Sequence, residues 1–212
     1  MATRKKNWAA AKIIGGLVLL VVAVVGLVYG AILREMERAE LDYSQGNAES
    51  ALQRYETVEQ QLRSYGVIRF MPRQDRQNLL LNQARLLYAL KRYDEAAERL
   101  ERENELSGMT TDGRFFLLRG NIAFRKAASD YTESQQKDAR VLEDALRGAE
   151  DNLRDSLRLT PQSWDAKYNY EFINYVRRMM NQNDDQNKVK ILMENVRVKE
   201  TQPQALPPDQ AS

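Results

Sequence analysis

The chain has 212 residues, of which 43% are hydrophobic and 29% are charged. Its formal charge is only +2, which argues against the basic surface that nucleic-acid binding requires. The sequence contains no cysteine and no histidine, and this excludes thiolate chemistry, histidine-based catalysis and nearly all zinc sites. We therefore expect a non-enzymatic protein of one ordinary-sized domain, with no cofactor, no metal and no nucleic-acid partner.

Residues 13–33 form an uncharged apolar segment, IIGGLVLLVVAVVGLVYGAIL. At about 1.5 Å per residue, a helix of this length crosses a hydrocarbon core of roughly 30 Å. A cleaved signal peptide is the alternative, but its apolar region usually spans only about 7–15 residues, and no small-x-small cleavage site precedes the charged stretch from Arg34. We therefore predict a retained transmembrane helix over residues 13–33.

Charges on the two sides of this segment predict its orientation. Cations dominate the N-terminal side, whereas Arg34 and Arg38 on the C-terminal side are mixed with glutamates. The N-terminal cations are Arg4, Lys5, Lys6 and Lys12. Because positively charged flanks stay in the cytoplasm, we expect residues 1–12 inside and everything after Leu33 outside. In a bacterium this describes a single-pass inner-membrane protein with its C-terminal domain in the periplasm.

Two glycines within the segment, Gly26 and Gly30, form a G-x-x-x-G pair. Small residues at this spacing let two membrane helices approach closely. Glycine is also common in membrane helices that do not associate, so a homodimer through Gly26 and Gly30 stays an open alternative.

Residues 34–196 carry apolar side chains at spacings of three and four, among strong helix formers. This is the period of amphipathic helices, and no stretch alternates as a strand would. A coiled coil would need an unbroken apolar stripe, but glycines and prolines interrupt it, at Gly46, Gly66, Pro72, Gly108, Gly113 and Pro161. Residues 197–212 are rich in Pro and Gln and are expected to be disordered. We predict an all-α protein in which one transmembrane helix precedes a domain of short antiparallel helices.

Two stretches of this domain align with each other. Ala39, Gly46, Ala51 and Tyr55 of the first stand at the positions of Ala84, Lys91, Ala96 and Leu100 in the second. Small residues at these spacings, with a turn between them, resemble the tetratricopeptide repeat (TPR), whose paired helices touch at small side chains. Lys91 stands where that family usually has glycine. The resemblance implies a TPR-like solenoid of helix pairs, and an irregular helical bundle is the alternative.

A third pair resembles the repeat, with Gly120 on its first helix and Ala149 on its second. These two residues lie much further apart in sequence than their counterparts, so we expect either an insertion around residues 129–137 or longer helices. The first two repeats are also widely spaced. An aromatic and basic loop over residues 63–73, which contains Gly and Pro, would account for that spacing.

A fourth first helix is expected at DAKYNYEF, residues 165–172, with Glu171 at the small-residue position. One anchor, a few TPR units and this last helix resemble the MxaK-like proteins encoded beside MoxR-type ATPases and von Willebrand A (VWA) proteins in methanol-oxidation gene clusters. The DAKYN string carries much of that likeness. The resemblance implies a scaffold that aids assembly or maturation of a periplasmic, methanol-type dehydrogenase, with MoxR/VWA-type assembly proteins as partners. A translocon-associated periplasmic chaperone with TPR-like repeats is the alternative.

Candidate chemical sites are few. Asn181, Asn183 and Asp185 alternate like the start of an EF-hand calcium loop, but Gln186 replaces the required glycine and Leu192 the bidentate glutamate. We interpret this stretch as a polar loop. An enzyme that uses carboxylates alone, such as a lytic glycosidase, would need a paired acid and base, and no spacing indicates one. We name no catalytic, cofactor-binding or metal-ligating residue.

Candidate partner contacts follow from the repeat alignment. In stacked helix pairs the first helices line the concave surface, so their residues that packing does not need are available to a partner. Tyr, Phe and Arg among them are types that protein interfaces favour, although Tyr88 and Phe124 would serve equally well as core residues. The candidates are Asn78, Arg85, Tyr88, Arg114, Asn121, Phe124, Tyr168 and Tyr175.

Overall fold

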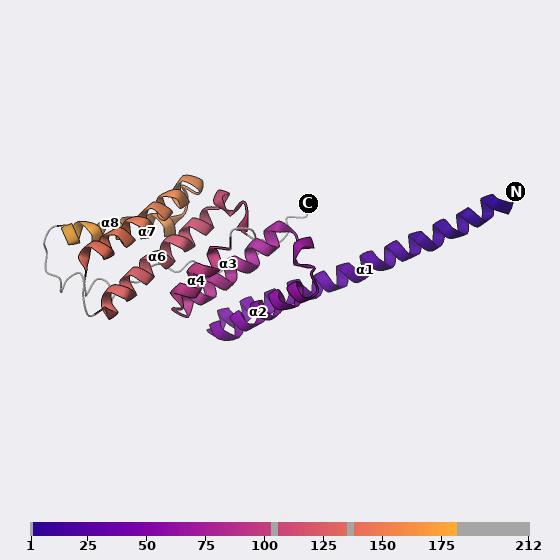
Figure 1. Cartoon of the computed structure of the whole chain (residues 1–212), viewed down its shortest axis with the longest axis horizontal. Coiled ribbons are helices and arrows are strands. Elements are labelled where there is room, and N and C mark those ends of the chain that lie inside the picture. Colours follow the sequence, from indigo (N-terminus) through magenta and orange to yellow (C-terminus); the bar gives the residue numbers. More distant parts are fainter. Residues whose placement is uncertain (1, 103–105, 135–137, 182–212) are drawn as a thin grey trace. The chain divides into compact units, whose positions relative to one another are not determined.

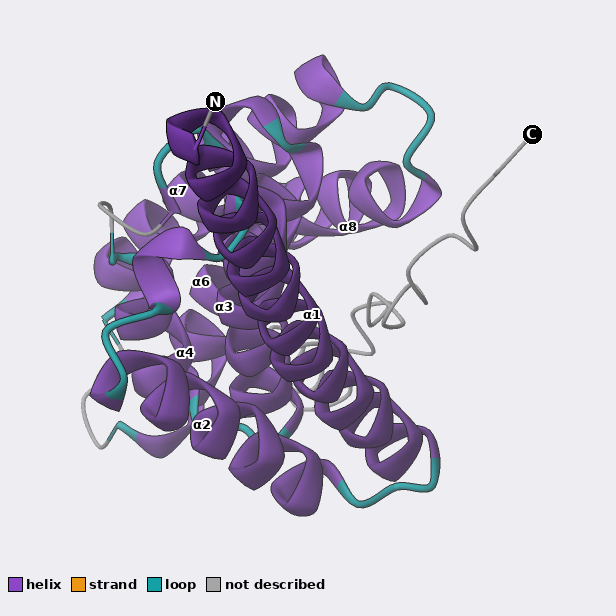
Figure 2. Ribbon diagram, turned by 90° about the vertical axis from the view of Figure 1, so that its right-hand side faces the viewer, coloured by secondary structure: helices purple, strands orange, loops and turns teal. Residues whose placement is uncertain are grey.

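The computed structural model describes residues 2–102, 106–134 and 138–181. Within those ranges the chain forms seven α-helices and two short 3-10 turns, and no strand (Figure 1). The same described ranges are drawn as helices joined by loops in Figure 2. The prediction of an all-α protein is therefore confirmed. By contacts the chain divides into two compact units, Met1–Gln61 and Leu62–Ser212.

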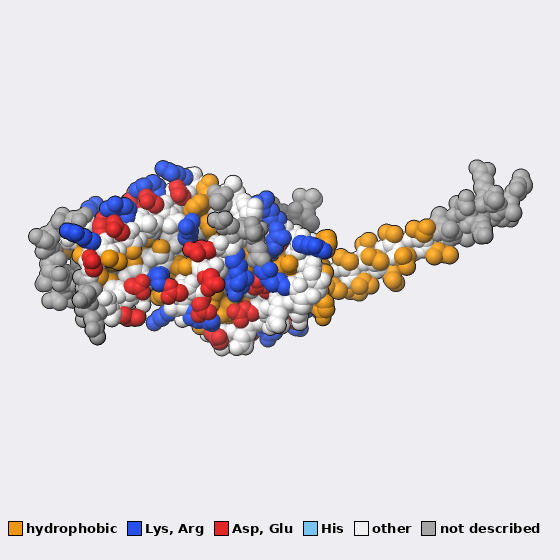
Figure 3. Space-filling view, in the orientation of Figure 1, with side chains coloured by type: hydrophobic (Ala, Val, Ile, Leu, Met, Phe, Trp, Pro, Cys, Tyr) orange, Lys and Arg blue, Asp and Glu red, His pale blue; other side chains and the backbone are white. Residues whose placement is uncertain are grey.

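The first unit contains α1 (Ala2–Ser44) and most of α2 (Ala48–Ser64). Helix α1 passes without a break through the predicted span, and its apolar side chains are exposed along residues 13–28, as Figure 3 shows in orange. A window of this helix has a mean hydropathy of 2.8, so the helix is long and apolar enough to cross a membrane.

Helix α2 packs antiparallel against the last turns of α1. The Tyr55 hydroxyl donates to the carbonyl oxygen of Met36 at 3.3 Å, and Arg54 bonds to Asp42 at 2.6 Å. Ala39 and Ala51, the small residues that the repeat alignment singled out here, are both fully buried. These contacts tie α2 to the part of α1 that follows the apolar segment.

The described residues of the second unit include five helices that pack in chain order. Each helix contacts the next one, and the alternate helices α3 with α6 and α6 with α8 also touch. The helices are α3 (Arg73–Ala89), α4 (Tyr93–Leu100), α6 (Gly113–Glu133), α7 (Ala139–Leu159) and α8 (Trp164–Asn181), with 3-10 turns η1 (Ile68–Phe70) and η2 (Met109–Thr111).

The largest packing interface of this unit lies between α6 and α7. A Cβ atom added to Gly120 would lie 2.9 Å from Leu153 Cγ and 3.1 Å from the Ala149 carbonyl oxygen. Only glycine allows this approach without a shift, which explains the small residues at both positions. Helices α6 and α7 have 21 residues each, so longer helices account for the wide spacing within the third pair.

Three helix ends share one turn geometry. Gly46, Gly66 and Lys91 have φ values of 86°, 65° and 62°, in the left-handed region. After each of these residues, the backbone N–H of the next residue donates to a carbonyl oxygen in the last turn of the preceding helix, which is the Schellman pattern. Asn47 donates to Asp42 and Arg92 donates to Leu87, both at 2.9 Å. Gly46 and Lys91 therefore do occupy equivalent turn positions, as the alignment predicted. The connection predicted over residues 63–73 is shorter in the structure, because α2 continues to Ser64 and α3 begins at Arg73; η1 lies inside it.

One detail of the alignment is wrong. Glu171 is exposed, because the inward face of α8 is formed by Ala166, Asn169, Ile173 and Val176, which are buried. The small-residue position of this helix was thus misplaced. The predicted end of the helical domain (residues 182–196) and the predicted tail (197–212) lie outside the described residues.

Candidate functional site

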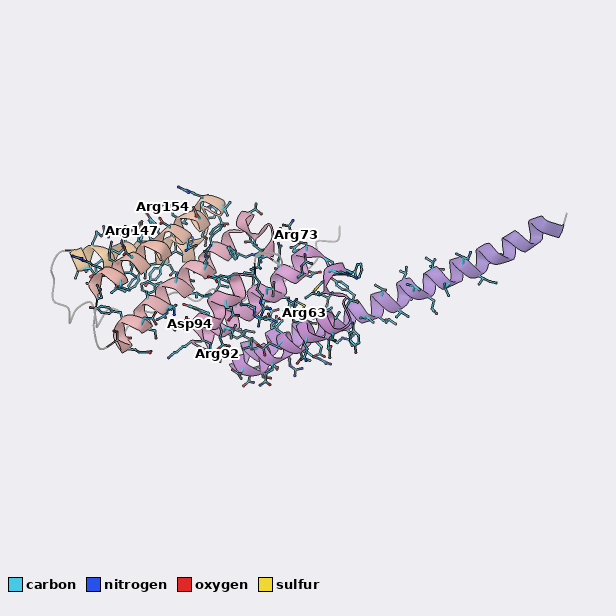
Figure 4. The ribbon with its side chains drawn as sticks, viewed as in Figure 1. Arg63, Arg73, Arg92, Asp94, Arg147 and Arg154 are labelled. Atoms are coloured by element: carbon cyan, nitrogen blue, oxygen red, sulfur yellow. The ribbon has the colours of Figure 1, made fainter. Side chains whose placement is uncertain are left out.

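An open cleft of about 600 Å³ lies in the second unit, where the first turns of α3 and α6 meet the end of α7. Its walls carry guanidinium, amide and hydroxyl groups and one carboxylate. Those side chains belong to Arg73, Gln77, Asn78, Asp112, Arg114 and Thr160. Figure 4 labels Arg73 at the beginning of α3.

The first turn of α3 holds one wall of the cleft in position. Arg73 Nε donates to the carbonyl oxygen of Ser107 at 2.5 Å, and Gln77 Nε2 donates to the same oxygen at 2.8 Å. The neighbouring Gly108 has a φ of 86°, and a Cβ added there would overlap the Arg73 guanidinium. The backbone conformation therefore favours glycine at this position, and a side chain there would displace the Arg73 guanidinium.

Asp112 caps the N-terminus of α6 and binds Arg114. One carboxylate oxygen accepts from the Arg114 backbone N–H at 2.8 Å, and the other accepts from the Arg114 side chain at 2.6 Å. Burial raises the pKa of Asp112, but the hydrogen bonds from Arg114 and the charges of Arg114 and Arg85 outweigh it, so the pKa lies below its ordinary value. Asp112 is therefore a charged structural cap at neutral pH and is unsuited to donating a proton.

The end of α7 forms a further wall of the cleft, through Thr160. The Ser156 hydroxyl, which is fully buried, donates to the Gly113 carbonyl oxygen at 2.7 Å. A Cβ added to Gly113 would lie 2.3 Å from Thr160 Oγ1. The start of α6 is thus pressed against the last turn of α7, and this contact fixes the position of Asp112 and Arg114.

Three of the eight predicted contact residues gather around this cleft. Asn78 and Arg114 line it, and the half-buried Arg85 lies near enough for its charge to lower the pKa of Asp112. Tyr168 and Tyr175 lie on α8, where 47% and 43% of their surfaces are exposed. They are open to solvent but are not among the residues that line the cleft.

The other three candidates are buried, which is a correction to the predicted contact surface. Asn121 and Phe124 are each 1% exposed, and Tyr88 is 6% exposed. Phe124 packs edge-on against the Phe172 ring with centroids 5.8 Å apart, and Tyr88 lies 5.9 Å from the Tyr93 ring. Because neighbouring helices cover them, these side chains lie inside the fold and are not exposed on its surface.

Sequence reasoning missed Arg73, Gln77 and Asp112. One signal was available for Asp112, because an aspartate immediately before a helix is a common N-cap. No comparable signal marked Arg73 or Gln77, since their role depends on a backbone carbonyl that folding brings close. Among the described residues no cluster of three or more potential metal-ligating side chains occurs.

No protein-family model matches the chain, and neither a curated protein nor a solved structure matches it. The function must therefore be argued from the arrangement itself. The cleft presents cationic and amide donors around one carboxylate that is already paired. Such a surface suits the binding of an acidic or carbonyl-rich segment of another protein.

Proposed function

We propose that this protein is a membrane-anchored, TPR-like interaction scaffold, in which α1 crosses the bilayer and the helices after α2 bind a protein partner. The proposal rests on the structure of α1. It joins an exposed, uncharged apolar segment without a break to turns that pack against α2. A soluble protein would hide such a surface, whereas a bilayer would cover it.

Packing in the second unit supports the TPR-like part of the proposal. Helices α3 and α4 form one pair and α6 and α7 another, while among the first helices α3 contacts α6 and α6 contacts α8. Small residues are buried at Ala84, Ala96 and Ala149, and Lys91 repeats the turn conformation of Gly46. This combination is what stacked helix pairs require, because each pair buries its faces only against its neighbours.

We further propose that the partner is an assembly protein of the MoxR/VWA type and that the scaffold aids maturation of a periplasmic, methanol-type dehydrogenase. The support for this step is the sequence resemblance at residues 165–169, together with the donors of the cleft. In α8 the DAKYN residues Ala166 and Asn169 are buried, while Tyr168 is exposed. The string thus contributes to both the packing and the surface of the last described helix.

A topology experiment tests the anchor. Alkaline phosphatase fused after residue 196 should be active, because the enzyme folds only outside the cytoplasm, and deletion of residues 2–33 should abolish the activity. An inactive fusion together with a bright cytosolic fluorescent fusion at the same site would reverse the orientation.

A crosslinking experiment tests the interaction surface. A photoreactive amino acid at Asn78, in the cleft, should capture a MoxR- or VWA-type protein or a dehydrogenase subunit in native membranes, and Arg114→Glu should reduce the yield. The same group at Val141, which is 66% exposed on α7, is the matched control. Equal capture from both positions would show that the cleft is not the binding surface. Capture of translocon components would favour the chaperone alternative.

A further inference from the structure

The connection between α2 and α3 carries the most exposed aromatic side chains of the second unit apart from Trp164. Tyr65 is 78% exposed and Phe70 is 76% exposed, and Val67 between them is also exposed. The Arg69 guanidinium lies over the Phe70 ring, 5.0 Å from its centroid. The sequence has no acidic residue between Glu59 and Asp75. The loop is therefore both apolar and basic.

Backbone hydrogen bonds hold this loop in one conformation. Gly66, with a φ of 65°, ends α2, and the Val67 N–H donates to the Leu62 carbonyl oxygen at 3.0 Å. The Phe70 N–H then donates to the Val67 carbonyl oxygen at 2.9 Å, and the following Met71 is buried. The exposed side chains thus project from an ordered turn, which lowers the entropy cost of binding through them.

Helix α2 brings the chain back toward the apolar segment of α1. Within the first unit, Tyr55 lies level with Met36, only three positions beyond the end of that segment. At about 1.5 Å per residue, the six residues from Tyr55 to Gln61 run back by about 9 Å, which more than covers the distance from Met36 to Leu33. Gln61 therefore lies about 4–5 Å past the level of Leu33, just inside the point where α1 would leave the hydrocarbon core.

Chain length then limits where the loop can be. Tyr65 follows Gln61 by four residues, which span at most about 14 Å even when fully extended. This limit holds for any orientation of the second unit. The headgroup region adds about 5–7 Å on each side of the hydrocarbon core, so Tyr65 lies within reach of it.

We propose that residues 63–70 dock on the surface of the bilayer that α1 spans, with Tyr65 and Phe70 among the lipid headgroups and Arg69 against anionic ones. The inference rests on the proposed anchoring by α1. Tyrosine rings and arginine side chains favour this region, since their apolar parts enter it while their polar ends stay hydrated. Anionic lipid complements a basic loop that lacks acidic residues. Because α1 holds the loop nearby, weak binding suffices to orient the helical domain.

Fluorescence quenching in vesicles tests this docking on the full chain. The chain has no cysteine, so a single introduced cysteine can carry an environment-sensitive fluorophore. We would label Val67→Cys, which keeps both aromatic residues of the loop, in vesicles of phosphatidylcholine and phosphatidylglycerol with brominated acyl chains. Leu20→Cys within the apolar segment reports the anchor. Val141→Cys, exposed on α7, is the control for the fluorophore itself.

The anchor predicts strong quenching of a fluorophore at position 20 by bromines deep in the bilayer. Docking predicts that shallow bromines quench a fluorophore at position 67 at least twofold more than one at position 141. The quenching at position 67 should decrease when phosphatidylglycerol is omitted. Tyr65→Ser with Phe70→Ser should lower the Val67 signal to the Val141 level and leave Leu20 unchanged. Quenching at Leu20 without quenching at Val67 overturns the docking and leaves the anchor intact; the loop would then face a protein or a second copy. A Val67 signal that survives the double substitution also overturns it. No quenching at Leu20 overturns the anchor and the docking together.

Discussion

Asn169 on α8 donates a 2.8 Å hydrogen bond from its Nδ2 to Asn121 Oδ1 on α6, and both side chains are buried. This bond joins two alternate helices of the second unit directly. Among the described residues, Asn121 Nδ2 and Asn169 Oδ1 have no further hydrogen-bond partner. The pair therefore leaves two buried polar groups unsatisfied, so its contribution lies in fixing the register of α8 on α6 more than in stability.

Asn169→Leu should destabilise the protein by about 1–3 kcal/mol, because it leaves the whole amide of Asn121 without a partner in the core. The double variant Asn121→Leu with Asn169→Leu should recover most of that loss, since both polar groups are then gone. Chemical denaturation of the full chain in detergent micelles, followed by circular dichroism, measures the cycle. Additive losses in the double variant would show that the two amides do not depend on each other.

Gly120→Ala tests the close approach of α6 and α7. Alanine normally stabilises a helix by about 0.5–1 kcal/mol relative to glycine. At Gly120 the added Cβ would crowd Leu153 and the Ala149 carbonyl oxygen, so we expect a net loss of about 1–3 kcal/mol instead. Gly148→Ala on α7 is the matched control, because nothing lies within 4 Å of its added Cβ, and it should stabilise. The same sign of change at both glycines would contradict the packing.

Features that depend only on neighbouring residues along the chain could be predicted from the sequence. The apolar period predicts helices. The turn at Lys91 was predictable from its alignment with Gly46, and both residues adopt the left-handed conformation at the end of a helix.

Residues whose role depends on distant neighbours could not be predicted. A helical period shows which face of α6 is apolar, but it does not show which helices cover that face, so Asn121 and Phe124 were taken for a surface. The misplacement of Glu171 has the same cause, because the register of α8 is set by its contacts with α6 and α7. The cleft depends on the Ser107 carbonyl oxygen, and no side-chain pattern marks a backbone group.

Lys91→Gly should stabilise the protein. Lys91 has a φ of 62°, a conformation that costs a residue with a side chain about 1–2 kcal/mol and costs glycine very little. We expect a gain of about 0.5–1 kcal/mol after the greater freedom of glycine in the unfolded chain is subtracted. Gly46→Lys, the reverse change at the equivalent turn, should lose a similar amount. Thermal denaturation measures both, and a destabilised Lys91→Gly would show that this turn is not left-handed in solution.

Ala96→Leu should destabilise the protein by about 1–3 kcal/mol, because Ala96 is fully buried where α4 packs and a larger side chain does not fit. The neighbouring Ala97 is only partly buried on the same helix, so Ala97→Leu is the matched control and should cost less. Melting curves in which the two variants coincide would contradict the helix pairing.

Asp112→Asn removes the charge of the α6 cap and keeps its capping hydrogen bond, because asparagine also caps helices well. At pH 7 we expect a loss of about 0.5–1 kcal/mol, the usual size for a partly exposed ion pair. The folded-state pKa of Asp112 lies below its ordinary value of 3.8, so the stabilisation by its charge is present above that pH and disappears as the pH falls through the folded-state pKa. The two proteins should therefore converge in stability once the pH has fallen below that folded-state pKa. Arg114→Gln, which removes the partner, should show the same convergence. Unfolding curves measured from pH 7 to pH 2 decide this, and a difference that stays constant over the whole range would show that the ion pair with Arg114 contributes nothing.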